Sequence, residues 1–324
     1  MSAQKRRYYL DALRIVACLA VAMIHVSGLN RCSVSIYSMQ WEVFNLFECI
    51  SRWAVPVFVM ISGALFLKSD KPIRAILRQN VSRLAVAYLA WGAFYAWFEH
   101  PQDIGAFLML VLTGHFHMWY IPMLVGLYLV TPLLRPIARD KKLCTYFLLL
   151  SFVFAIGVPF AGKALALVSP YRSQQFVGLI GKLGLKNMVG FSLYFVLGYY
   201  LDNLQRRYSA KRLALLLAGA LASIVAGTVL LSFGVGTQVD LLLGTFTPGD
   251  FAAASLVFLL VKNCSRASSP RTTQEALPSC ACCLRSPLAC TSSIRSSSSR
   301  LEGGLASPPR PLGLFSRSCS YTPS

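Results

Sequence analysis

Long apolar segments alternate with short basic segments over the first 262 residues of the chain. Eight of the apolar segments are long enough to cross a bilayer as helices. They lie at about 9–30, 42–67, 82–99, 118–138, 143–161, 187–202, 213–233 and 243–262. A further apolar segment, 104–117, is too short to cross, and we expect it at the outer face. The pattern predicts an all-α, polytopic transmembrane helix bundle.

The basic residues between these spans gather at alternate ends of the predicted bundle. The five richer groups are Lys5/Arg6/Arg7, Lys68/Lys71/Arg74/Arg78/Arg83, Arg135/Arg139/Lys141/Lys142, Arg206/Arg207/Lys211/Arg212 and Lys262/Arg266. The opposite ends carry only Arg31, Arg52, Lys163, Arg172, Lys182 and Lys186. Cytoplasmic loops are enriched in Lys and Arg, so this alternation places the N-terminus in the cytoplasm.

Composition agrees with a membrane protein and argues against a nucleic-acid partner. The 324 residues are 56% hydrophobic and 13% charged, whereas a soluble domain carries about 25% charged residues. The formal charge of +19 follows from the basic loops, so we expect a lipid bilayer and no nucleic acid around the chain. We expect no cleaved signal peptide, because the first apolar segment is as long as a span.

The chain changes character at Asn263. Residues 1–262 form the predicted transmembrane domain, and 263–324 form a tail rich in Ser, Arg, Pro and Cys that we expect to be disordered. The run Cys280–Cys283 matches no standard zinc spacing, so no metal is expected there. A second hypothesis is out-of-frame translation of the tail. Shifting the frame of Pro287–Ser296 permits the apolar reading Ser-Gly-Val-Tyr-Leu-Ile-His-Pro-Leu.

Three ionisable residues lie on one stripe of the first span, "YLDALRIVACLAVAMIHVSG". On a helix, Arg14 and His25 are about 20° apart around the axis and about 16 Å apart along it. Asp11 lies on the same stripe, where it can stabilise the helix start and pair with Arg14. Arg14 alone could reach back to the interface. A histidine at this depth indicates catalysis or proton handling, or else a satisfied contact inside the bundle.

At these residues the sequence resembles the acyltransferase-3 family of integral-membrane acyltransferases. The family's Arg-x10-His signature is matched by Arg14 and His25. Its second-span motif is similar to "VPVFVMISGALFL" (55–67), and its His-x-Trp-[Phe/Tyr] segment is similar to "HMWY" (117–120). The last match resembles the branch that O-acetylates surface polysaccharides such as enterobacterial common antigen. The family's Arg-x2-Arg pair is incomplete here, because Asn80 precedes Arg83. The family also has ten spans, against eight here.

The resemblance implies transfer of an acyl group, most often acetyl from acetyl-CoA as co-substrate, to a sugar hydroxyl of a glycan or its lipid-linked precursor. His25 would act as general base or nucleophile, Arg14 would contact the donor, and Asp11 would support Arg14. Arg74, Arg78 and Arg83 would hold the CoA phosphates, although topology explains them equally well. His117, Trp119 and Tyr120 would bind the acceptor, although an interfacial aromatic belt predicts the two aromatic rings equally well.

No permanently bound cofactor is expected, and His115 with His117 is too small a set for a metal. The resemblance places the protein in a bacterial inner membrane. Two alternatives stay open at this point: a glycan exporter, and an inactive truncated fragment. Small residues at 219–222 are expected to serve helix packing.

Overall fold

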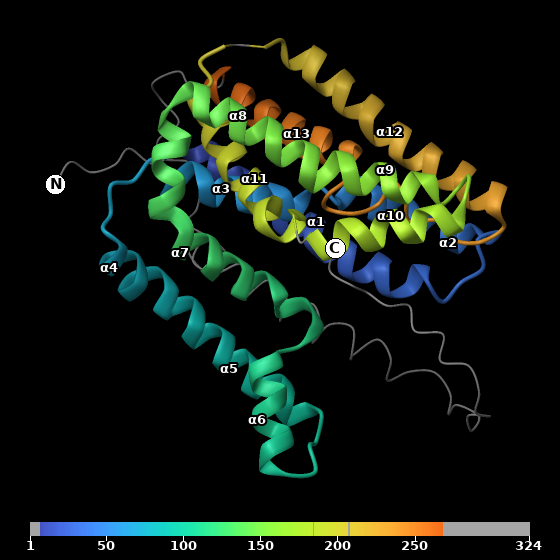
Figure 1. Ribbon diagram of the computed structural model, residues 1–324, viewed down its shortest axis with the longest axis horizontal. Helices are drawn as coiled ribbons and strands as arrows, with labels where there is room; N and C mark the ends of the chain where they lie inside the picture. Colours follow the sequence, from blue (N-terminus) through green and yellow to red (C-terminus); the bar gives the residue numbers. More distant parts are fainter. Residues whose placement is uncertain (1–6, 184, 207, 268–324) are drawn as a thin grey trace. The chain divides into compact units, whose positions relative to one another are not determined.

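The computed structural model describes residues 7–183, 185–206 and 208–267, which form helices and no strand (Figure 1). The helices group into two compact units. Unit 1 combines the chain up to Val55 with the chain from Tyr208 onward, and unit 2 is Pro56–Arg207. This grouping brings together in unit 1 helices that are about 200 residues apart in sequence.

Helices form at all eight predicted spans. Their bounds are α1 Tyr8–Arg31, α2 Met39–Ser51 with α3 Ala54–Phe66, α5 Ser82–Phe98, α7 Tyr120–Arg139, α8 Lys141–Phe152, α11 Leu185–Asn203, α12 Ala210–Val235 and α13 Pro248–Ala267. Among the described residues, five stretches are long and apolar enough to cross a membrane: Tyr8–Arg31, Met39–Phe66, Phe116–Arg139, Lys141–Leu165 and Ala210–Val235. The all-α polytopic class is therefore confirmed.

The remaining elements show where the predicted boundaries were wrong. The short apolar segment forms α6, Ile104–Thr113, as expected, and α8 continues through a π-helical turn, η3 Val153–Gly157, into α9 Val158–Leu165. Residues 170–183, which were predicted only as part of the outer connection between two spans, form α10, Pro170–Leu183. A short helix, α4 Ile73–Ile76, and a π-helical turn, η1 Leu77–Val81, precede α5.

The last described helix begins five residues later than predicted and extends into the predicted tail. Thr247 caps α13, because its hydroxyl accepts a hydrogen bond from the Asp250 backbone N–H at 3.2 Å. Pro248 at the first helical position suits the same start. The helix runs to Ala267, so residues 263–267 are helical rather than disordered. The rest of the predicted tail, and the out-of-frame hypothesis for it, lie outside the described residues.

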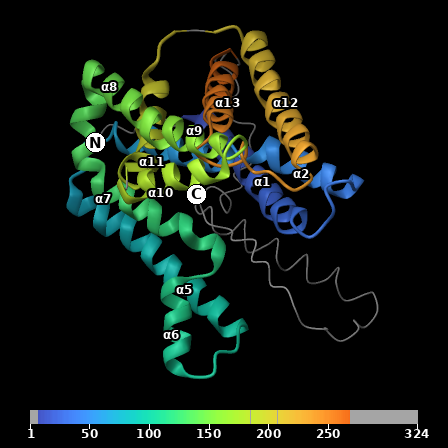
Figure 2. The ribbon, with the colours of Figure 1, turned by 45° about the vertical axis from the view of Figure 1, so that its right-hand side comes forward.

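Unit 1 is a ring of four helices in which α1 packs on α2, α2 on α12, α12 on α13, and α13 on α1. Figure 2 shows α12 lying beside α13. The first turn of α1 meets α13 through an edge-to-face contact between Tyr9 and Phe258. Cys49 and Ile224 belong to the buried cluster that joins α2 to α12. Buried apolar contacts therefore close the ring between its N-terminal and C-terminal helices.

A charged network lies in unit 1, with the buried Arg31 and Glu48 at its centre. The Glu48 carboxylate pairs with both Arg31, at the end of α1, and Arg52, directly after α2. Arg31 also reaches Asp240 at 2.5 Å and donates to the Asn45 side chain at 3.3 Å. Arg31 and Glu48 are only 2% and 1% exposed. Each charge is compensated by its neighbours, so the network ties α1, α2 and the segment before α13 together.

This network corrects the prediction for Arg31 and Arg52. Both were assigned to sparsely charged outer loops, but Arg31 is helical and buried, and Arg52 is paired to Glu48. The reason is that positive-inside counting treats each basic residue as a free loop charge. It takes no account of a carboxylate within the apolar segment, such as Glu48, that draws arginines into the protein.

Unit 2 packs by close helix contact at two glycines. A Cβ atom at Gly63 of α3 would collide with the backbone carbonyl of Phe195 on α11, and one at Gly198 would collide with that of Met60. Such small residues let two backbones approach, as membrane helices require. The prediction that 219–222 is a packing site is not matched in the same way, because nothing lies within 4 Å of a Cβ at Gly219.

Replacing Glu48 with Gln tests the network in unit 1. Glu48→Gln removes the shared carboxylate and leaves the buried Arg31 undercompensated, so we expect the free energy of unfolding to fall by about 3–5 kcal/mol. The measurement is denaturant unfolding of the purified protein in detergent. Glu42→Gln is the control, because Glu42 is exposed on the same helix, and it should change the value by less than about 0.5 kcal/mol. Equal effects of the two changes would contradict the network's role.

Candidate functional site

The predicted stripe of α1 lies along one edge of its packed face. The buried positions of α1 include Leu10, Leu13, Ala17 and Ile24. Asp11, Arg14, Cys18 and His25 each follow one of these residues directly, and each is half-buried. One residue later the helix is exposed at Ile15, Leu19 and Val26. The edge therefore separates the protein-facing side of α1 from its exposed apolar side.

Asp11 and Arg14 form the predicted ion pair. Arg14 Nη1 lies 2.9 Å from Asp11 Oδ1, one helical turn away. Asp11 is also in the first turn of α1, where a carboxylate is favoured by the helix dipole. Asp11 can therefore stabilise the start of α1 and pair with Arg14 at the same time. The Arg14 side chain is 32% exposed. Its ion pair with Asp11 holds the guanidinium group close to the helix.

The buried network lies beside the turn of α1 that follows His25. A Cβ placed on Gly28, three residues after His25, would be 3.5 Å from Oε1 of Glu48. On α1, Arg14 is half-buried near the start of the helix and His25 is half-buried further along. The Glu48 carboxylate of α2 lies close to the turn of α1 that follows His25. Sequence reasoning missed Glu48, Arg31 and Asp240. The rule used for His25, that a charge in an apolar helix needs a polar neighbour, could have identified Glu48.

The second group of predicted site residues lies in unit 2. Arg74 belongs to α4, Arg78 to the π-helical turn η1, and Arg83 to the first turn of α5; all three side chains are exposed. A π-helical turn inside a helix is uncommon and is frequent at functional sites. These are three exposed guanidinium groups on one short helical stretch, and guanidinium groups are suited to binding phosphate.

A second basic group lies at the same end of unit 2. Arg139, at the end of α7, lies 2.5 Å from Asp70, which precedes α4. Arg135 donates to the Lys71 backbone carbonyl at 2.7 Å. The Arg139 guanidinium hydrogen-bonds the Asp70 carboxylate and thereby holds its pKa below the ordinary value of 3.8. The sequence predicted that these two basic groups share one end, and in unit 2 this is confirmed.

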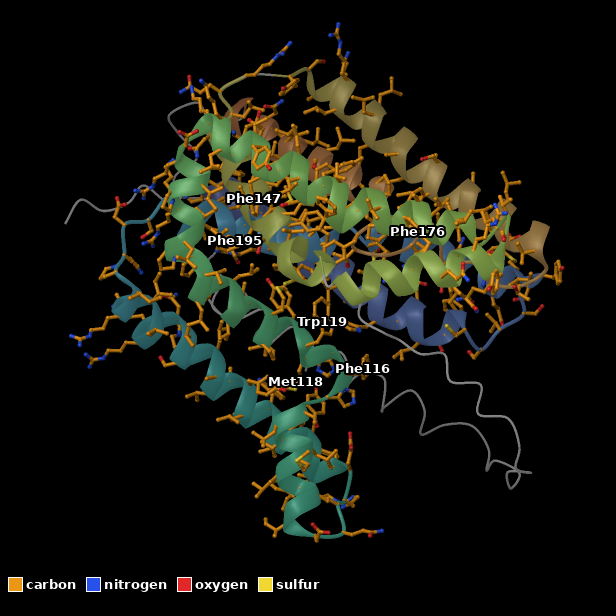
Figure 3. The ribbon with its side chains drawn as sticks, in the orientation of Figure 1. Phe116, Met118, Trp119, Phe147, Phe176 and Phe195 are labelled. Atoms are coloured by element: carbon orange, nitrogen blue, oxygen red, sulfur yellow. The ribbon has the colours of Figure 1, made fainter. Side chains whose placement is uncertain are left out.

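The third group, His117, Trp119 and Tyr120, lies on the turn that leads into α7. A 3-10 turn, η2 Phe116–Trp119, ends where α7 begins at Tyr120. Figure 3 shows Phe116, Met118 and Trp119 on this turn. The Trp119 ring lies 5.6 Å from that of Phe191 on α11, and the Tyr120 ring 6.2 Å from that of Phe58 on α3. Both aromatic side chains are therefore held by neighbouring helices of unit 2.

The structure thus places the predicted residues in two sets: Asp11, Arg14 and His25 on α1 in unit 1, and the arginine and aromatic groups in unit 2. Comparison with protein families gives one match, to the model described as an acyltransferase domain, acyltransferase-3, over residues 7–276. The chain belongs to this family. Comparisons with curated proteins and with solved structures gave no significant match.

The family match fixes the class of activity. An acyltransferase domain that covers α1 to α13 makes this chain a membrane acyltransferase by family, with helices apolar enough to cross the bilayer. Acyl transfer commonly uses a base and a positive charge, and α1 carries one half-buried imidazole, His25, and one guanidinium group paired to a carboxylate, Arg14.

Proposed function

We propose that this protein transfers an acetyl group from cytoplasmic acetyl-CoA to a sugar hydroxyl of a cell-surface polysaccharide or its lipid-linked precursor. The observation that carries the proposal is the edge of α1, which holds Arg14 and His25 half-buried on one side of a membrane-length helix. Ionisable groups in such a helix are costly unless they face a polar path, so their presence indicates chemistry. The family match supports the acyl-transfer step.

His25 serves as the general base in this proposal. Its imidazole takes the proton of the acceptor hydroxyl while the hydroxyl oxygen attacks the thioester carbonyl carbon. The tetrahedral intermediate then breaks the carbon–sulfur bond, and the CoA thiolate receives that proton from the imidazolium. The products are the sugar ester and free CoA. An acetyl-histidine intermediate is the variant in which His25 attacks the thioester itself.

Arg14 acts on the donor side. About 16 Å along the axis from His25, it cannot touch the same imidazole. Its pair with Asp11 leaves the remaining guanidinium N–H groups to bind an acyl donor, and Asp11 holds the group in place. Arg14 can also extend its side chain toward the cytoplasmic membrane interface in this role, because the donor approaches from the cytoplasm.

Arg74, Arg78 and Arg83 bind the CoA phosphates. Arginine matches phosphate geometry with paired N–H groups, and these three side chains are exposed on one helical stretch that includes the π-helical turn. His117, Trp119 and Tyr120 contact the acceptor sugar, where aromatic faces suit pyranose rings and the imidazole suits a hydroxyl. The proposed setting is a bacterial inner membrane, with the N-terminus in the cytoplasm as the basic loops indicate.

Replacing His25 with Ala tests the chemical role. We expect His25→Ala to lower acetyl transfer by about 10²–10⁴-fold, the contribution of a positioned general base. The measurement uses membranes that contain the full chain and acetyl-CoA labelled in the acetyl group, and follows label in extracted glycan and on the protein. His100→Ala is the matched control, because His100 is an exposed histidine outside the helices, and it should leave transfer unchanged.

The same assay separates the alternatives. Undiminished labelling of glycan by His25→Ala would contradict the role of His25. Movement of unlabelled glycan across the membrane, without transfer of label, would support an exporter and contradict the enzyme. Both variants are compared at equal amounts of folded protein, measured by size-exclusion chromatography in detergent.

The arginine surface is tested by the donor's Michaelis constant. Arg78→Gln should raise KM for acetyl-CoA about threefold and leave kcat unchanged, since one exposed charge contributes up to about 1 kcal/mol. The effect should shrink at high salt and vanish with acetyl-pantetheine, which has no phosphate group. Arg172→Gln, an exposed arginine of α10 in the same unit, is the control. An unchanged KM for Arg78→Gln would leave topology as the explanation of these arginines.

A further inference from the structure

Two histidines in the turn before α7 form a direct hydrogen bond. Nδ1 of His115 lies 2.7 Å from Nδ1 of His117. The two rings have centroids 4.7 Å apart, and both lie against Tyr95 of α5, with His115 stacked at 4.8 Å and His117 edge-on at 5.0 Å. Spacing i+2 on a helix would separate these side chains. They meet because His115 precedes the 3-10 turn η2 and His117 lies within it.

The short contact between two nitrogens restricts where the protons are. A neutral imidazole has one N–H, so a hydrogen bond between two Nδ1 atoms needs one ring with its proton on Nδ1 and one with a bare Nδ1. In the neutral pair the other nitrogens are then fixed as well. The ring that donates has a bare Nε2, and the ring that accepts carries its proton on Nε2. The bond thereby couples the two Nε2 atoms: when one is a hydrogen-bond acceptor, the other is a hydrogen-bond donor.

The surrounding turn is built to hold this geometry. α6 ends at Gly114, whose φ of +68° suits glycine. A Cβ there would lie 2.6 Å from the Tyr88 hydroxyl, and this hydroxyl donates to the Leu112 carbonyl at 2.8 Å. The Met118 N–H donates to the His115 carbonyl at 2.8 Å. Helices α5 and α6 thus fix the backbone on one side of the pair, and η2 fixes it on the other.

A metal explains the pair less well than a shared proton. Two Nδ1 atoms 2.7 Å apart are at hydrogen-bonding distance. In the part of the chain that the structure describes, no group of three or more His, Cys, Asp or Glu residues is arranged to hold a metal ion. Ring packing on Tyr95 alone would not require two nitrogens to face each other.

We propose that His115 is a positioning residue whose hydrogen bond couples the tautomer of His117 to its own, so that the two imidazoles act as one unit at the acceptor side of the site. The proposal deepens the proposed function and rests on it only for what His117 touches. A sugar hydroxyl both donates and accepts hydrogen bonds. Because the two rings must hold opposite tautomers, a hydroxyl that donates to, or accepts from, His117 Nε2 determines the state of both rings, which a single imidazole does not provide.

The test reads the tautomers directly and needs no turnover. The chain has only four histidines, so ¹⁵N-histidine labelling gives a small set of imidazole signals in nanodiscs at pH 9, well above the ordinary histidine pKa of about 6.5. We expect one Nδ1–H tautomer in the pair of wild-type rings. His115→Phe and His117→Phe, each of which keeps a ring beside Tyr95, should both abolish this signal, because the ring that stays loses the Nδ1–Nδ1 hydrogen bond and an imidazole in water favours the Nε2–H form.

Two results would overturn the proposal: Nε2–H tautomers for both rings in the wild type, or survival of the Nδ1–H signal in either variant. The first would show that no N–H···N bond exists, and the second that the tautomer is set elsewhere. Both readings stand whether or not acetyl transfer is observed, so failure of the proposed function is distinguishable from failure of this inference.

Kinetics then tests what the pair does for the reaction. His115→Phe should lower kcat about tenfold, the effect of one lost hydrogen bond, and leave KM for acetyl-CoA unchanged. His115→Asn should recover part of the loss, because its amide can donate to, or accept from, His117 Nδ1. A kcat for His115→Phe equal to that of the wild type, or equal losses for Phe and Asn, would contradict a positioning role.

Discussion

A charge inside an apolar helix must be met by another polar group of the protein, and much of this structure follows from that constraint. The Glu48 carboxylate compensates the charges of Arg31 and Arg52, and the three residues together join the end of α1 to α2. Asp11 compensates the charge of Arg14 near the start of α1. The first helix is therefore fixed by ion pairs near both ends. Between them, its half-buried edge presents His25 beside an apolar exposed face.

The same constraint links stability and activity. The Glu48 network lies beside the turn that follows His25, so residues that hold unit 1 together also define the surroundings of the proposed base. In unit 2, α3 and α11, which pack closely at Gly63 and Gly198, also contact Tyr120 and Trp119 beside the turn on which His115 and His117 meet. Proposed chemistry thus lies at the ends and edges of rigid helices, where packing limits the movement of each side chain.

The length of the apolar runs predicted the helices well, because a helix that crosses a bilayer needs a long run of apolar residues. The Arg14–His25 edge also followed from spacing alone, since helical geometry fixes angles between residues. Contacts between distant segments could not be predicted in this way. Asp240 reaches Arg31 across 209 residues of chain. The His115–His117 bond depends on a 3-10 turn, because two residues at i and i+2 on an α-helix would not face each other. The helix start at Pro248 was a local signal, Thr-Pro-Gly-Asp, that hydropathy alone overlooks.

The proposed function requires that the edge of α1 with Arg14, Cys18 and His25 faces a polar path, while Leu19 and Val26 face lipid. Cysteine labelling addresses this requirement, with a charged, water-soluble thiosulfonate applied to membranes that contain single-site variants. The background has Cys18, Cys32, Cys264 and the five cysteines that follow Cys264 replaced by Ser, and keeps the buried Cys49 and Cys144. The account predicts that cysteine at position 25, or restored at position 18, reacts rapidly and is protected by acetyl-CoA, whereas Leu19→Cys and Val26→Cys stay unreactive. Reaction at 19 and 26 with none at 25 would contradict it.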